Sequence, residues 1–76
     1  MQPKQLQYFL TAYATKNIQR AAEKLFVSRQ GISKTIRELE QELGADLFLR
    51  SPKGLEPTDF AEALFPHAKK LLDEYN

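Results

Sequence analysis

The 76-residue sequence predicts a mainly α-helical domain with a three-helix core, a small β-hairpin and a long C-terminal helix. Two observations lead to this prediction. Four segments carry apolar residues three, four or seven positions apart, the spacing of a helix with one buried face. Between the third and fourth segments, two short apolar runs flank the letters SPKG, with Pro52 and Gly54 placed as in a β-turn. The chain has no cysteine, so no disulfide can support its small core.

The first two helices are expected over about residues 3–15 and from residue 18. Pro3 suits the first turn of a helix, and Asn17 is a good N-cap for the second helix. The pair Ala21 and Ala22 is small, so another helix can approach closely there. The apolar stripe of the first helix is Leu6, Phe9, Leu10 and Tyr13.

The third helix is expected to start after Ser28 and to end before Gly44, a residue that suits the position after a helix. Two helices separated by a three-residue break predict a helix-turn-helix over about 18–37. The hairpin should occupy about 47–57, and Thr58 should cap the fourth helix over 59–76. Aromatic residues at helical spacing are expected to make core or dimer contacts: Tyr8, Phe9, Tyr13, Phe26, Phe48, Phe60 and Phe65.

Charge is distributed unevenly along the chain, although the net charge is only +1. Residues 1–37 hold seven basic side chains and one acidic one, a net charge of +6. Residues 38–76 hold four basic and nine acidic ones, a net charge of −5. A basic half beside an acidic half suggests a polyanionic partner for the first half. The alternative is that both halves are simply solvated surface.

The third helix has two different sides. Its apolar residues, from Ile32 to Leu43, fall within an arc of about 60°. A separate arc of about 140° carries hydrogen-bonding and basic side chains and no acid. A recognition helix presents its first turns to the major groove, where arginine and glutamine pair with guanine and adenine edges. A solvated helix face is the plainer alternative, with Gly31 only lowering stability. The second arc consists of Arg29, Gln30, Ser33, Lys34 and Arg37.

The order of these elements resembles the N-terminal DNA-binding domain of LysR-type transcriptional regulators, over about residues 3–72. The matching stretches are QLQYF (5–9), RAAEKLFVS (20–28), ISKTIRELEQELGADLFLR (32–50), GLEPT (54–58) and ALFPHAKKLL (63–72). The resemblance implies a winged helix-turn-helix that binds operator DNA as a dimer. It also implies that the fourth helix is the linker helix that pairs two protomers, and that a tolerated kink accompanies Pro66.

The sequence departs from the family pattern in three respects. The family often has Gln-Pro-Ala or Gln-Pro-Ser where this chain has Arg29, Gln30 and Gly31, so its base preference cannot be transferred. Ala61 replaces a frequent glycine. Family members also continue into an effector-binding domain that takes a small molecule. The chain is therefore expected to be cut from a longer regulator, and a natural short regulator is the alternative.

The expected partner is double-stranded DNA, an operator with dyad symmetry. Residues 1–58 should form the DNA-binding domain, and 59–76 should pair two chains into a homodimer. For DNA contact we expect base readout by the first turns of the third helix, and phosphate or minor-groove contacts by Arg37 and the hairpin. The expected DNA-binding residues are Arg29, Gln30, Ser33, Lys34, Arg37, Arg50 and Lys53. The expected dimerisation residues are Leu64, Ala68, Leu71, Leu72 and Tyr75.

Other function classes find little support in the sequence. His67 is the only histidine and no cysteine accompanies it, so no cluster suits a metal or a catalytic site, and no cofactor is expected. No apolar run approaches 18 residues, and a cytoplasmic, nucleoid-associated location with no membrane contact is expected. Two alternatives to a DNA-binding role stay open. One is a protein-interaction module with the same fold, and the other is an RNA-binding domain.

Overall fold

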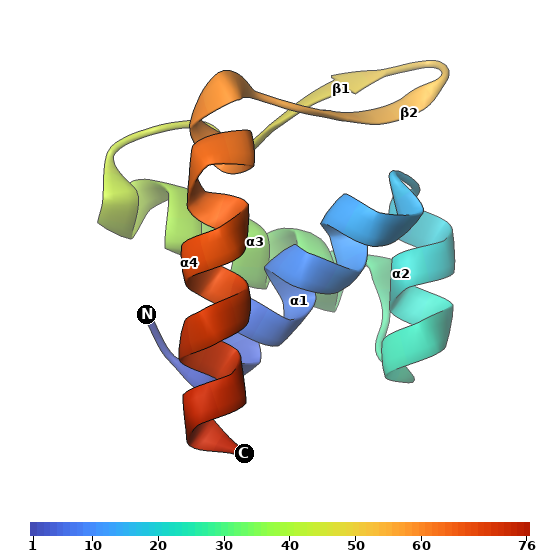
Figure 1. Ribbon diagram of the computed structural model, residues 1–76. Helices are drawn as coiled ribbons and strands as arrows, with labels where there is room; N and C mark the ends of the chain where they lie inside the picture. Colours follow the sequence, from blue (N-terminus) through green and yellow to red (C-terminus); the bar gives the residue numbers. More distant parts are fainter.

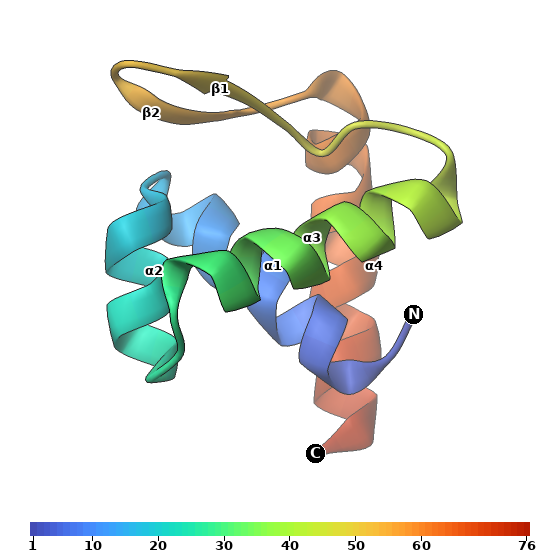
Figure 2. The same cartoon turned by 180° about the vertical axis from the view of Figure 1, so that it is seen from behind.

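The structure is a computed structural model that describes residues 1–76, and it contains four helices and one two-stranded antiparallel sheet (Figure 1). The mainly α-helical prediction is confirmed, and the hairpin stands as a wing above the helices (Figure 2). In chain order the elements are α1 (Pro3–Thr15), α2 (Ile18–Leu25), α3 (Arg29–Leu43), β1 (Phe48–Ser51), β2 (Gly54–Pro57) and α4 (Asp59–Tyr75).

The predicted helix caps are confirmed. The Asn17 side chain accepts a hydrogen bond from the Arg20 N–H at 2.9 Å. Ser28 and Thr58 cap α3 and α4 in the same way, each accepting from the N–H three residues later. Gly44 ends α3 in the left-handed conformation, with φ +70°. These local hydrogen bonds satisfy helix-terminal N–H groups that would otherwise lack a partner.

The helix α1 lies at the centre of the core and packs against α2, α3, α4 and β2. The ring of Phe9 is fully buried and lies between the rings of Tyr13 and Phe48, at centroid distances of 6.0 and 5.8 Å. This contact joins α1 to the start of the hairpin. The largest fully buried side chains are Phe9, Leu6, Ile32, Ile36, Leu39 and Leu47.

The wing, residues 47–57, is attached to the helices at two places. At its base, the Glu40 carboxylate accepts hydrogen bonds from the N–H groups of Leu47 (2.7 Å) and Phe48 (3.4 Å). Near its tip, the Leu55 N–H donates to the Lys16 carbonyl at 3.0 Å. Gly54 has φ +123°, and a methyl group there would lie 2.5 Å from that same carbonyl oxygen. The tip therefore rests directly on the turn between α1 and α2.

Phe26 lies outside the core of the chain. It was expected to make a core or dimer contact; its side chain is 95% exposed, so the core contact is wrong and the dimer contact stays a prediction. It follows the last residue of α2 and adopts the left-handed conformation, with φ +58°. That backbone conformation costs an ordinary L-residue about 1–2 kcal/mol, and asparagine tolerates it better.

We therefore expect Phe26→Asn to stabilise the domain. Relief of the left-handed strain should raise the melting temperature by about 4–8 °C, the shift expected for ~1 kcal/mol in a domain of this size. Circular dichroism melting checks this. Phe26→Ala is the control, because it removes the exposed ring and keeps the strain. If the alanine and asparagine variants melt together, the backbone conformation at residue 26 is not a source of strain.

The helix α4 continues through Pro66 and packs along α1. Ala68 is fully buried in the chain's own core, so it offers no surface to a partner, which corrects its expected dimer role. Leu64 and Leu72 are half-buried against the same core. Leu71 and Tyr75 stay exposed, at 36% and 59%. None of the four helices has both the length and the apolar character needed to cross a membrane.

Candidate nucleic-acid interface

The first turns of α3 present their polar side chains to solvent. Arg29, Gln30, Lys34 and Arg37 are exposed, and Ser33 is half-buried. Ile32, Ile36 and Leu39 hold the opposite side of the helix in the core. The two sides predicted from the helical wheel are therefore the buried and the exposed side of the folded helix.

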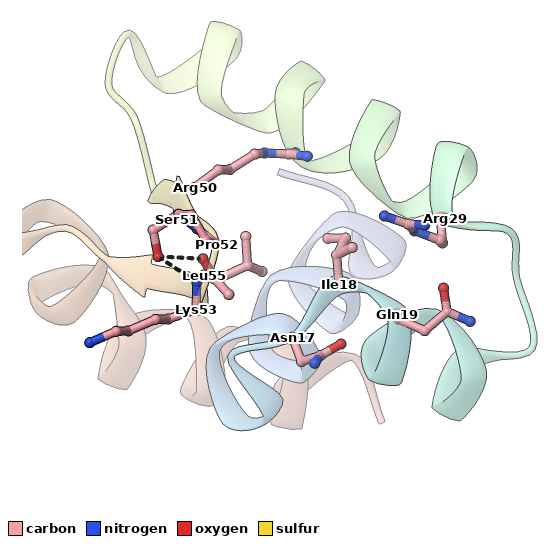
Figure 3. A pocket seen from close by; sticks show the side chains of 10 residues that line it. Asn17, Ile18, Gln19, Arg29, Arg50, Ser51, Pro52, Lys53 and Leu55 are labelled. Atoms are coloured by element: carbon pink, nitrogen blue, oxygen red, sulfur yellow. Dashed lines mark hydrogen bonds between the residues drawn. The ribbon is translucent and has the colours of Figure 1, made fainter.

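The wing extends this exposed surface. A hollow of about 450 Å³ lies where the wing meets the first turns of α2 and α3 (Figure 3). Arg50 extends from the wing toward α3, while Lys53 points outward from the turn of the hairpin. The residues that line the hollow are Asn17, Ile18, Gln19, Arg29, Arg50, Ser51, Pro52, Lys53, Gly54 and Leu55.

Two smaller hollows continue this surface along α3. One is lined by Ile18, Arg29, Gln30, Ser33 and Arg50, and it shares three of these residues with the first hollow. The next is lined by Gln30, Ser33, Lys34, Arg37, Glu38 and Gln41. All seven residues predicted for DNA contact therefore lie on one continuous surface, which we call the basic face: Arg29, Gln30, Ser33, Lys34, Arg37, Arg50 and Lys53.

The positive charge of the basic face is not neutralised within the chain. The one salt bridge of the structure joins the Met1 ammonium to Glu42, in the acidic second half of α3. Glu38 is the only acid that lines the three hollows, at the end distant from the wing. Five cations without an acidic partner create a positive potential that attracts a polyanion.

Several residues that line the hollows were not singled out for this role from the sequence, among them Ile18, Ser51 and Pro52. Ile18 belongs to the apolar stripe of α2, yet it lines two of the hollows between Arg29 and Arg50. Its helical spacing predicts a core position, so the pattern held no signal for this role. Ser51 and Pro52 line the first hollow from the hairpin turn, which was assigned only by its charged residues.

The cap of α3 gives a structural reason for glycine at residue 31. A methyl group at residue 31 would lie 3.1 Å from the Ser28 hydroxyl oxygen, which accepts the Gly31 N–H at 2.9 Å. Glycine therefore leaves the α3 cap undisturbed.

Comparison with known proteins finds the same family by sequence profile and by similarity to individual proteins. The sequence profile described as "Bacterial regulatory helix-turn-helix protein, lysR family" matches residues 3–62. The HTH-type transcriptional regulator CitR of Bacillus subtilis is 38% identical over 72 residues, covering 95% of this chain and 25% of CitR. The chain thus spans about a quarter of the length of such curated relatives.

Two solved structures of DNA complexes superpose on nearly the whole chain. The CbnR_DBD–DNA complex matches with a TM-score of 0.94 and 33% identity, covering 99% of this chain and 86% of that one. The BenM_DBD/catB site 1 DNA complex matches with a TM-score of 0.92 and 29% identity, covering 99% and 84%. The winged helix-turn-helix arrangement is therefore shared with domains that were solved on DNA.

Proposed function

Because this chain belongs to the lysR family of bacterial regulatory helix-turn-helix proteins, we propose that its basic face binds double-stranded DNA sequence-specifically in the regulation of transcription. The observation that carries the proposal is the continuity of the basic face, which joins the start of α3 to the wing without an intervening acid. A non-enzymatic role and a location on the nucleoid are part of the same proposal.

We expect the residues of the basic face to make two kinds of DNA contact. The first turns of α3, where a recognition helix meets base edges, carry Arg29, Gln30, Ser33 and Lys34. Arg37 lies farther along the same side, and Arg50 and Lys53 extend from the wing, where cations meet phosphates or the minor groove. Base contacts supply specificity and phosphate contacts supply position and affinity.

The interface also favours DNA over a docked protein. A protein-docking surface would present a cluster of apolar side chains, because such interfaces are depleted in charge at their centre. The hollow lined by Gln30, Ser33, Lys34 and Arg37 contains no apolar side chain. The protein-interaction alternative therefore lacks an apolar cluster in this hollow along α3.

Pairing of two chains through α4 supports the same function. Leu71 and Tyr75 are exposed apolar residues one helical turn apart, and both lie outside the basic face. A symmetric pair would bury them against their counterparts and would present two copies of α3 to one side of a duplex. An operator with dyad symmetry follows from this arrangement. Regulation by a small molecule bound to a further domain stays a prediction.

Salt dependence and sequence selection together test the proposed function. If the three cations assigned to the DNA backbone, Arg37, Arg50 and Lys53, meet phosphates, log K should fall with log[salt] at a slope of about −2.7. Selection from random duplex DNA should also yield a defined motif. Fluorescence anisotropy at several salt concentrations measures the slope. Affinity that depends on neither salt nor sequence would contradict the proposal.

A matched pair of variants tests whether the cations that contact DNA are those of the basic face. Arg37→Ala should reduce the magnitude of the slope by about 0.9, because one phosphate contact is lost. Lys69→Ala removes a cation from α4, outside the hollows, and should leave the slope unchanged. Equal effects of the two substitutions would show that net charge, and not the basic face, determines binding.

A further inference from the structure

A contact between the wing and the recognition helix bears on which base is recognised. The Arg50 guanidinium donates a hydrogen bond from Nη1 to the Ser33 hydroxyl oxygen, at 3.4 Å, although the residues are 17 positions apart. Arg50 is exposed and Ser33 is half-buried, and both line the hollow that also contains Arg29 and Gln30. The arginine therefore does more than offer a charge to a phosphate. It sits against a side chain predicted to contact bases.

The backbone that carries Arg50 is held in place. Arg50 pairs with Leu55 across the wing, and the Leu55 N–H is bound to the Lys16 carbonyl. Two residues before Arg50, the Phe48 N–H is bound to the Glu40 carboxylate of α3. The backbone that carries the arginine side chain is therefore held to α3 through β1 and to the end of α1 through β2.

The contact determines how the Ser33 hydroxyl can bond to DNA. A hydroxyl has one proton to donate and two lone pairs that accept. Arg50 occupies one lone pair, and its positive charge beside the oxygen opposes the approach of a second donor. Thr11 and Thr15 donate their hydroxyl protons to the carbonyl four residues earlier, at 2.8 and 2.9 Å, but Ser33 makes no such bond. The Ser33 proton remains free for an outside acceptor.

We propose that Arg50 is a specificity-determining residue that acts through Ser33 by making its hydroxyl a hydrogen-bond donor toward the major groove. The proposal rests on the DNA-binding function proposed above. Guanine offers the acceptors N7 and O6 in the major groove, adenine offers N7 and thymine offers O4, whereas cytosine offers only the N4 amino donor. The base that faces Ser33 is therefore a guanine, an adenine or a thymine in preference to a cytosine.

Selection experiments on four variants test this inference. The full 76-residue chain and its Ser33→Ala, Arg50→Ala and double variants are each used to select sequences from random duplex DNA. Wild type should disfavour cytosine at one position by about five- to 150-fold, the range of a good base contact. Ser33→Ala and Arg50→Ala should both weaken this preference at that same position, and the double variant should weaken it no further.

Lys53→Ala is the matched control, because it removes a cation from the same hairpin without touching Ser33. It should lower affinity for all sequences alike and leave the selected motif unchanged. If Arg50→Ala behaves like Lys53→Ala, Arg50 is a phosphate contact only and the inference is overturned. A cytosine preference at the position affected by Ser33→Ala would overturn it as well.

The outcomes separate this inference from the proposed function. A wild-type chain that selects no motif would refute sequence-specific binding itself. A wild-type chain that selects a motif, combined with an Arg50→Ala motif that is identical to it, would refute only the role of Arg50. Melting curves of each variant confirm that the comparison is made between folded proteins, since both Arg50 and Ser33 lie outside the buried core.

Discussion

Leu71→Asp should bind a full operator about 10²- to 10⁴-fold more weakly than the wild-type chain, while a single half-site is bound with unchanged affinity. Linking two binding modules raises overall affinity by this factor, and the variant loses the link. Leu71 is 36% exposed, so an aspartate there is solvated in the monomer and leaves the fold intact. In the proposed dimer the same carboxylate would be buried without a partner, which is strongly unfavourable.

Analytical ultracentrifugation gives the oligomeric state of both proteins, and anisotropy with full and half operators gives the affinities. Lys69→Gln is the matched control. It changes the net charge by the same single unit and lies about 160° away from residue 71 around the helix, given 100° per residue. It should dimerise and bind like wild type. A wild-type chain that stays monomeric both free and on DNA would refute pairing through α4.

The second large effect is expected in the core. Phe9→Ala should lower the free energy of unfolding by about 3–5 kcal/mol, the usual cost of such a cavity. A chain of this length is stable by only about 4–11 kcal/mol in total. Phe9 is fully buried between the rings of Tyr13 and Phe48, and Phe48 is the first residue of β1. The substitution should therefore loosen the wing as well as the helices.

Urea unfolding and thermal melting measure the loss, and we expect the melting temperature to fall by about 15 °C or more. Phe60→Ala is the control with the same change in chemistry. Its side chain is 41% exposed, so its truncation should have a small effect. Similar losses at both positions would mean that burial of Phe9 does not dominate the stability of this domain.

The helices and their ends could be predicted from the sequence because their causes are local. Asn17, Ser28 and Thr58 each accept a hydrogen bond from a backbone N–H three residues later, and Gly44 adopts a conformation that favours glycine. The two sides of α3 follow from the same local periodicity. Residues close in sequence determine these features, so one sequence is enough to find them.

The features that could not be predicted depend on contacts distant in sequence or on the crowding of a small core. Helical spacing suggested that Ala68 was free to meet a partner, but α1 covers it. Helical spacing grouped Phe26 with the core or dimer contacts, but it follows the end of α2 in the left-handed conformation and its side chain is exposed. The bond between Arg50 and Ser33 needs the wing folded over α3, and no pattern in the sequence encodes that distance.

The hydrogen bond from the wing to the Lys16 carbonyl bears on how the wing can move. The helix α1 packs against α4, and Lys16, the residue after its last turn, receives the Leu55 N–H. Gly54 lies so close to the Lys16 carbonyl that the tip of the wing has no room to move toward it. We therefore expect the wing to move together with α1 and α4. In a dimer paired through α4, the angle at which the two α4 helices cross would determine the spacing and tilt of the two wings. Operators of different curvature would then be accommodated by that crossing angle or by bending of the duplex, and not by flexing within a subunit.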